Sequence, residues 1–313
     1  MWRFWRMWTI LAFISALCLG FYDISKKIAL RENRVVDVLT ISVCISALLL
    51  SVPLWLSRLC PEVMTGTPFY VPQLDGEAHL YTILKSVIVL SSWVFAYISL
   101  KHLPLSVVSP MQATRPMWTL VGALLIFGER LNTWQWIGVC LAIGTVFVFS
   151  FKNKSKIKNH KSQINTRYYI ALALAILIGA CSGLYDKYLM RRYDHNAVQV
   201  YYTFYQALMM LIVWVIVNRK NHQSPITNLQ SIKNIGVIAL ISLFLIISDN
   251  VYMLALRDPD SLIAVVSTIR RGGAVIGFAY GLIFLKEPDP WHKVLCMVGI
   301  LAGLLCLAIG SMG

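Results

Sequence analysis

Three arginines lie inside long apolar stretches of the sequence. Arg115 is in the stretch 104–127, and Arg270 and Arg271 are in the stretch 261–285. A guanidinium group stays protonated and can bind a carboxylate or a phosphate through two parallel hydrogen bonds. At the centre of a membrane-spanning helix each arginine costs roughly 2.5–3.5 kcal/mol, so the fold has to place it near water, a carboxylate or a ligand. We therefore take these arginines as candidates for binding an anion.

The alternative is that the same arginines form structural or gating ion pairs. Three aspartates in apolar stretches could supply the partners: Asp23, Asp186 and Asp249. Adjacent residues on a helix point about 100° apart, so Arg270 and Arg271 are expected to do different jobs, one binding while the other pairs. Asp249 is the candidate for ion coupling, or for neutralising an arginine when the site is empty.

Polar and helix-breaking residues surround Arg115. Gln112 precedes it by one helical turn and therefore shares its face. Pro110 and Pro116 flank the arginine and are expected to break the helix locally, which would free backbone carbonyls beside the site. Asn250, which follows Asp249, is a further candidate ligand.

Two Tyr-Asp pairs occupy matching places near the ends of their apolar stretches. They are Tyr22-Asp23 and Tyr185-Asp186. These residues could gate the site or carry protons. The alternative is that the aspartates pair at the membrane surface with neighbouring lysines, which are Lys26, Lys27 and Lys187.

Composition identifies the elements that must position these residues. Hydrophobic residues make up 58% of the 313 and charged residues only 13%, whereas a soluble globular protein has about 25% charged residues. The mean hydropathy is +0.68. These values exclude a soluble enzyme, and the net charge of +14 is expected on loops beside lipid headgroups rather than on a nucleic-acid surface.

An all-α polytopic membrane protein with ten transmembrane helices is therefore predicted. About 20 apolar residues cross a bilayer, and windows of that size fall at 7–25, 38–57, 80–100, 104–127, 132–151, 168–189, 197–217, 235–256, 261–285 and 291–311. A polar and aromatic group opens the seventh window and is expected to form an interfacial belt or a wall that stacks on a sugar or ring: Tyr201, Tyr202, Phe204, Tyr205 and Gln206.

The sequence also repeats itself after about 160 residues. Cys18, Gly20 and Tyr22-Asp23 recur as Cys181, Gly183 and Tyr185-Asp186, Arg115 recurs as Arg271, and Glu129 recurs as Glu287. The first five-helix repeat is predicted at 1–151, a basic linker at 152–167 and the second repeat at 168–313. Two tandem units of five spans must have opposite orientations, which is the inverted-repeat architecture of secondary transporters.

These features resemble the drug/metabolite transporter superfamily, and its EamA-like branch most of all. The motifs that carry the resemblance are Gly128-Glu129 followed by Trp134 and Trp136, and Lys286-Glu287 followed by Trp291. The resemblance implies a carrier of small metabolites in the cytoplasmic membrane, here expected to be bacterial, that works by alternating access. It also implies cytoplasmic termini, whereas the distribution of basic residues favours termini outside, so the orientation stays open.

A second resemblance, to the triose-phosphate translocators of plants, concerns the site. Those proteins carry an adjacent basic pair on span nine and a basic residue on span four that hold phosphate. Arg270, Arg271 and Arg115 occupy similar places here, and Tyr252 would match a phosphate-contacting tyrosine. The resemblance implies the charge of the substrate and not its identity.

We therefore expect a secondary-active transporter of a small anionic metabolite, phosphorylated or carboxylated, bound near the membrane midplane. The alternatives are an exporter of amino acids or drugs with a neutral or zwitterionic substrate, or a flippase for an anionic lipid. No catalytic residue, metal or cofactor is expected, because the six histidines lie at span ends or in loops without ligand spacing. The expected partners are the substrate and the lipid bilayer, without nucleic acid, and the protein is either a monomer or a homodimer.

Overall fold

The computed structural model describes residues 2–127, 132–141, 144–145, 166–190, 192–220, 232–257, 263–287 and 290–312. The protein is all-helical, with 88% of its residues in helices and no strand in these ranges. The motif Gly128-Glu129, the basic linker up to residue 165 and the end of the window 132–151 lie outside the described residues.

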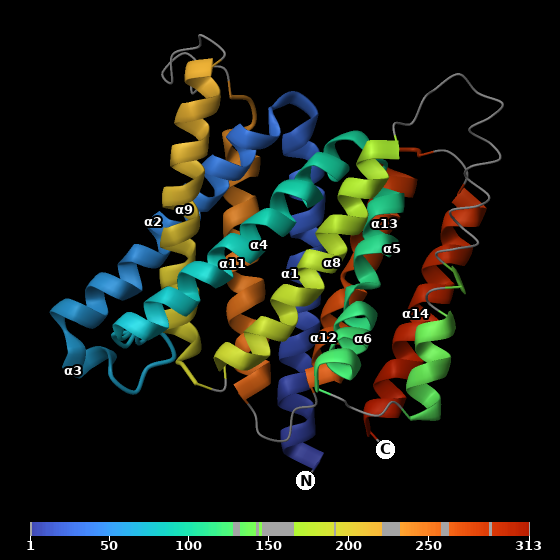
Figure 1. Ribbon diagram of the computed structural model, residues 1–313, viewed down its shortest axis with the longest axis horizontal. Coiled ribbons are helices and arrows are strands. Elements are labelled where there is room, and N and C mark those ends of the chain that lie inside the picture. The colour runs from blue at the N-terminus through green and yellow to red at the C-terminus, as the bar shows by residue number, and fades with distance from the viewer. Residues whose placement is uncertain are drawn as a thin grey trace.

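The helices follow the apolar windows closely (Figure 1). Their bounds are α1 Trp2–Glu32, α2 Val35–Leu59, α3 Pro61–Met64, α4 Gly76–His102, α5 Leu105–Ala113, α6 Arg115–Phe127, α8 Thr166–Met190, α9 His195–Lys220, α11 Ile235–Arg257, α12 Ile263–Gly272, α13 Ala274–Ile283 and α14 Pro290–Met312. Residues 133–141 are helical as well.

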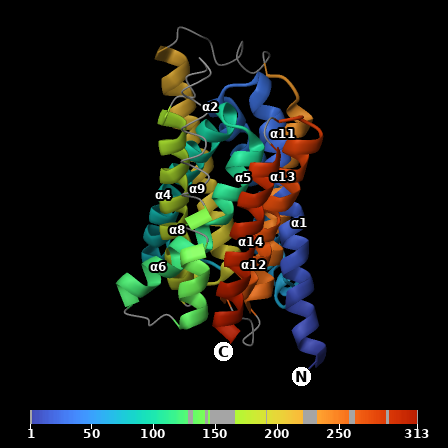
Figure 2. The same cartoon turned by 90° about the vertical axis from the view of Figure 1, so that its right-hand side faces the viewer.

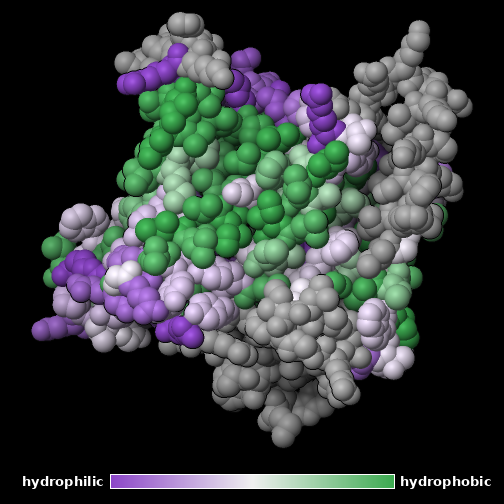
Figure 3. Space-filling model, in the orientation of Figure 1, coloured by the Kyte–Doolittle hydropathy of each residue, from purple (hydrophilic) through white to green (hydrophobic). Residues whose placement is uncertain are grey.

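Five helices in the described ranges are long and apolar enough to cross a membrane. They are Val35–Leu59, Gly76–His102, Thr166–Met190, His195–Arg219 and Ile235–Ala255. The chain is therefore a multi-pass membrane protein. The surface agrees with this arrangement, because a broad apolar face separates polar regions at two ends of the molecule (Figure 3).

Two of the expected spans are broken near their centres. The first consists of α5 and α6, which are separated by Thr114, and the second consists of α12 and α13, which are separated by Gly273. At the first break the amide of Thr114 donates to the carbonyl of Met111 at 3.2 Å, and at the second the amide of Gly273 donates to the carbonyl of Arg270 at 3.2 Å. Both breaks therefore tighten into a turn instead of continuing the α-helical bonding pattern.

Helices from the two halves of the chain alternate in the bundle (Figures 1 and 2). The most extensive contacts join α1 to α11 and α4 to α8, followed by α2 with α9 and α5 with α13. The two broken spans therefore pack against each other and beside the long helices. The two chain ends lie at the same end of the bundle (Figure 1).

Candidate functional site

Arg115 is the first residue of α6, directly after the break. Pro116 follows it and has no backbone N–H to donate, so the start of a helix is a position that tolerates this residue. Pro110 lies inside α5 and likewise cannot donate to the helix ladder. The break therefore falls between the two prolines, and it places the arginine at the inner end of a half-helix.

The guanidinium group of Arg115 lies against α8. Its Nη2 donates to Oε1 of Gln112 at 2.9 Å and lies 3.5 Å from the carbonyl of Ala175. A Cβ on Gly179 would meet the Arg115 side chain, with 2.6 Å to Nε and 2.7 Å to Nη2. The Nε atom of Arg115 is buried and has no hydrogen-bond partner in the described part of the chain. The arginine therefore occupies space that the absence of a side chain at residue 179 provides.

Arg270, near the end of α12, is held by α11. Its Nη2 pairs with Oδ1 of Asp249, and both side chains are largely buried, at 14% and 13% exposed. Its guanidinium lies over the ring of Tyr252, 4.3 Å from the centroid. The second carboxylate oxygen of Asp249 accepts a hydrogen bond from the hydroxyl of Tyr202 at 3.3 Å. The charge of Arg270 is thus compensated within the protein.

Arg271 differs from its neighbour. It is half-buried, and it makes no hydrogen bond or ion pair with any residue that the structure describes. It lies within electrostatic range of Arg115 and Arg270, which repel it, and of Asp23, which attracts it. Arg270 is therefore neutralised by Asp249, whereas the guanidinium N–H groups of Arg271 can donate hydrogen bonds to a ligand.

The surroundings of Arg271 carry an excess of positive charge. Lys26 is buried, pairs with Asp23 at 2.6 Å, and lies within electrostatic range of both Arg115 and Arg271. Together with Arg270 and Asp249, this makes four cations and two carboxylates, which we call the basic cluster: Lys26, Arg115, Arg270, Arg271, Asp23 and Asp249. Uncompensated charge at membrane depth is costly, so an anion that enters the cluster would be stabilised there.

The aspartates of the two Tyr-Asp pairs are in ion pairs. Asp23 pairs with Lys26 on its own helix. It does not lie near the helix end, as its sequence position suggested, because α1 continues to Glu32. Asp186 pairs with Lys85 of α4 at 2.7 Å, and no contact to Lys187 can be described, because the position of that side chain is outside the described residues.

Lys85 is the residue of this region that sequence reasoning missed. The sequence did not single it out, but only 2% of it is exposed, and its Nζ lies 4.6 Å from the ring centroid of Tyr202. Its position inside the window 80–100 was the available signal. Lys26 was expected at the surface and is buried.

The remaining candidate residues have smaller roles. Tyr22 is buried beneath the ammonium group of Lys26, which lies 3.9 Å from the ring centroid. Tyr185 donates a hydrogen bond to the carbonyl of Tyr81 at 3.1 Å. Asn250 is half-buried on α11 and makes no hydrogen bond within the described ranges. None of these contacts reaches the basic cluster except the one made by Tyr22.

The repeated glutamate of the second half holds the start of α5. The Oε1 atom of Glu287 accepts a hydrogen bond from the amide of Leu105 at 2.8 Å, and Oε2 accepts from the amide of Ser106 at 3.0 Å. The ammonium of Lys293 lies 3.5 Å from Oε2. The first amides of a helix lack partners within the helix and attract negative charge. Glu287 therefore caps α5 and links the second half of the chain to the first.

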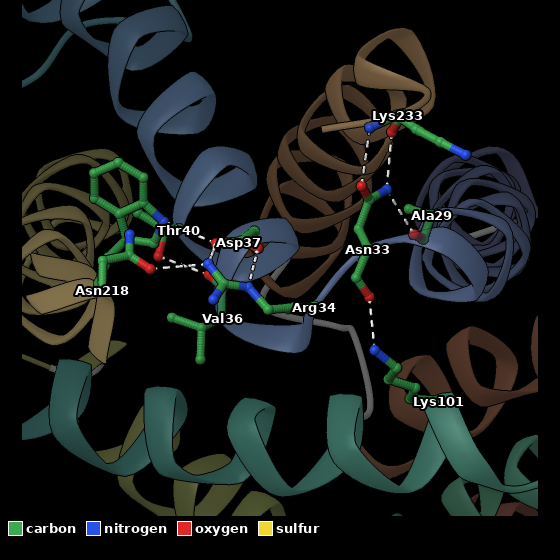
Figure 4. A network of polar contacts seen from close by, with 10 residues as sticks. Ala29, Asn33, Arg34, Val36, Asp37, Thr40, Lys101, Asn218 and Lys233 are labelled. Carbon is green, nitrogen blue, oxygen red and sulfur yellow. Dashed lines mark hydrogen bonds and ion pairs between the residues drawn. The ribbon is translucent and has the colours of Figure 1, made fainter. Parts of the chain in front are cut away.

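A polar network closes the same end of the bundle (Figure 4). Arg34 donates to both carboxylate oxygens of Asp37, at 2.7 and 2.9 Å, and to Oδ1 of Asn218 at 2.8 Å. The hydrogen bonds to Asp37 raise the pKa of Arg34 above its ordinary value, so it stays charged. Asn33 bonds the backbone of Lys233, and Lys101 donates to the carbonyl of Asn33 at 2.8 Å. Helices α1, α2, α4, α9 and α11 are therefore linked at this end.

Comparison with known families identifies the first half of the chain. Residues 6–151 match the EamA-like transporter family. The match confirms the resemblance to the drug/metabolite transporter superfamily, and with the membrane-spanning helices it indicates a membrane transporter of small molecules. No curated protein matches the chain at a significant level.

Proposed function

We propose that this EamA-like protein is a secondary-active transporter of a small anionic metabolite, which binds at Arg271 and Arg115 between two inverted five-helix repeats. The observation that carries the proposal is the arginine pair on α12: Asp249 neutralises Arg270, whereas Arg271 makes no ion pair within the described residues. Of the other candidate ligands, Gln112 accepts a hydrogen bond from Arg115 and Tyr252 lies against Arg270; Asn250, which follows Asp249 on α11, is proposed as a further ligand.

The positions of the helix breaks support binding at mid-membrane. Secondary transporters commonly build their sites from discontinuous helices, whose half-helix N-termini favour anionic groups. The N-termini of α6 and α13 begin directly after the breaks, and Arg115 lies at the first of them. Arginine side chains and helix N-termini thus add to the same positive potential.

The pairing of helices supports the proposed inverted repeats. If α1 and α8 are repeat mates, as are α4 and α11, then a two-fold axis in the membrane plane converts the α1–α11 contact into the α8–α4 contact. These are the two most extensive contacts of the bundle. The same proposal includes ten membrane spans and transport by alternating access. In it, the ion-paired aspartates Asp23, Asp186 and Asp249 couple transport to an ion or gate the site. It also includes a place in the cytoplasmic membrane of a bacterium.

Uptake into proteoliposomes tests the proposal. The purified protein is supplied with phosphorylated, carboxylated and neutral metabolites, and the series is repeated with Arg271→Ala and with the control Arg219→Ala at the exposed end of α9. We expect anions to be transported, and Arg271→Ala to reduce their uptake about tenfold or more, since a charge-assisted hydrogen bond contributes about 1.5–3 kcal/mol. Arg219→Ala should match the wild type.

The alternative functions predict different outcomes in the same assay. Uptake of neutral or cationic compounds that is indifferent to Arg271→Ala would contradict anion binding and favour a drug or amino-acid exporter. Movement of a labelled anionic lipid between leaflets, without uptake of soluble anions, would favour a flippase. Both outcomes would overturn the proposal.

A further inference from the structure

A second polar site lies beside the basic cluster, in a cavity between α2, α4, α9 and α11. The cavity has room for about one water-sized group, and its polar lining residues are Ser46, Gln199, Tyr202, Thr203, Gln206 and Asp249. Four of these lie on α9 at helical spacing, so they form one polar stripe. The sequence predicted either an aromatic belt at the membrane interface or a wall that stacks on a sugar or ring in this part of the helix, and the structure shows that Tyr202 and Gln206 are buried.

Gln206 gives this cavity its chemical character. The residue is 0% exposed, and neither its amide nitrogen nor its amide oxygen has a hydrogen-bond partner among the residues that the structure describes. A buried polar group without a partner costs about 1–3 kcal/mol, and because buried polar groups in native proteins are nearly always hydrogen-bonded, such a group indicates a place for a small hydrogen-bonding molecule or group. A group that satisfies both atoms has to accept one hydrogen bond and donate another.

Asp249 joins the cavity to the basic cluster. Its carboxylate lines the cavity and at the same time pairs with Arg270 and accepts from Tyr202. Because Arg270 compensates this carboxylate, the cavity offers a neutral amide rather than a free negative charge. The cavity has room for little more than one water-sized group, far less than the roughly 300–1,000 Å³ that encloses a whole drug-sized ligand. It therefore suits one small group of a molecule whose charged end lies elsewhere.

We propose that this cavity binds a neutral hydrogen-bonding group of the transported anion, such as a hydroxyl, through the amide of Gln206. The inference rests on the proposed function, and it narrows the substrate to hydroxylated anions. A hydroxyl group both donates and accepts, as the unpartnered amide requires. Discrimination against an analogue without that group is strong when the site would otherwise be left unpaired.

Charge-matched pairs of compounds test the inference. The probes are propyl phosphate with 3-hydroxypropyl phosphate, and succinate with malate, each measured by competition for uptake into proteoliposomes. The wild type should prefer the hydroxylated member by about tenfold, as two neutral hydrogen bonds allow. Gln206→Leu should bring this ratio close to one. The control Thr82→Val alters a buried hydroxyl that donates within its own helix, and it should keep the preference.

Each other outcome overturns the inference in a recognisable way. The wild type could transport both members of a pair equally well, in a manner that depends on Arg271. This result would leave the proposed function in place and show that the amide of Gln206 binds only a buried water. Preference for 3-aminopropyl phosphate, lost in Asp249→Asn, would assign the cavity to a cation instead. If Gln206→Leu fails to fold, Gln206→Asn, which keeps the amide but shortens its reach, should lower the ratio, and an unchanged ratio would refute the inference. No uptake of any anion refutes the proposed function itself.

Discussion

Arg115 lies against Gly179 of α8, in the space where any other residue would carry its Cβ. An ideal Cβ at residue 179 would be 2.6 Å from Nε and 2.7 Å from Nη2 of the arginine. Real Cβ atoms do not approach other heavy atoms so closely, so the guanidinium would have to move. Glycines spaced like Gly179 and Gly183 commonly serve the close packing of membrane helices. For Gly179, the partner in this packing is the charged end of a candidate binding residue.

Gly179→Ala is therefore expected to impair transport more than stability. The methyl group displaces the guanidinium of Arg115 from its contact with Gln112, and a displacement of about 1 Å can cost about a hundredfold in a positioned site. We expect anion uptake to fall at least tenfold while the melting temperature in detergent changes little. Gly183→Ala is the matched control, because its Cβ would be 3.6 Å from the nearest atom of Thr119. Equal effects of the two substitutions on uptake would contradict this role of Gly179.

The ion pair between Arg270 and Asp249 predicts a distinctive pattern of stability. Arg270→Ala leaves a largely buried carboxylate without its counter-ion, and removal of one partner of a buried pair costs about 3–5 kcal/mol. Replacement of both by apolar residues, Arg270→Met with Asp249→Leu, removes both charges and is expected to recover most of that loss. The melting temperatures of the wild type, Arg270→Ala and the double variant in detergent measure these differences in stability. A double variant that is no more stable than Arg270→Ala would show that the pair has no such coupling.

Glu287 predicts a stability effect that comes from a helix end. Glu287→Ala removes the acceptor for the amides of Leu105 and Ser106, and the loss of a capping side chain costs about 0.5–2 kcal/mol. Glu287→Gln keeps an acceptor but loses the charge that the helix N-terminus favours, so it should lie between alanine and the wild type in melting temperature. Glu62→Ala, at an exposed position on α3, is the control and should be neutral. If Glu287→Gln is as unstable as Glu287→Ala, charge rather than hydrogen bonding dominates the cap.

Much of the fold was predictable because membrane insertion imposes simple rules. Apolar windows of the required length located α2, α4, α8, α9 and α11, since every backbone group in the bilayer must be bonded within its own segment. Pro110 and Pro116 located the break between α5 and α6, because proline cannot donate to the helix ladder. The second break, at Gly273, has no proline and was not predicted. Glycine permits such a turn but does not demand one.

The pairing of charges was less predictable, because it depends on contacts between helices. Arg115, Arg270 and Arg271 were evident from the cost of charge in apolar sequence. Lys85 lies close to the start of its window, and only the contact between α4 and α8 shows that it is buried beside Asp186. Gln206 was expected only within an interfacial belt or a stacking wall and not as a buried hydrogen-bonding group, because an amide in sequence carries no sign of whether its hydrogen bonds are made.

The pair of Lys85 and Asp186 provides a last prediction, which depends on an asymmetry in burial. The lysine side chain is 3% exposed, whereas the aspartate is 38% exposed. Asp186→Asn strands a buried ammonium group, so we expect a loss of a few kcal/mol, reduced by the partial exposure of the aspartate. Lys85→Met strands a carboxylate that water can reach, and the loss should be smaller. Melting temperatures in detergent should therefore place Lys85→Met above Asp186→Asn, and the reverse order would show that Lys85 stabilises the fold through contacts other than this pair.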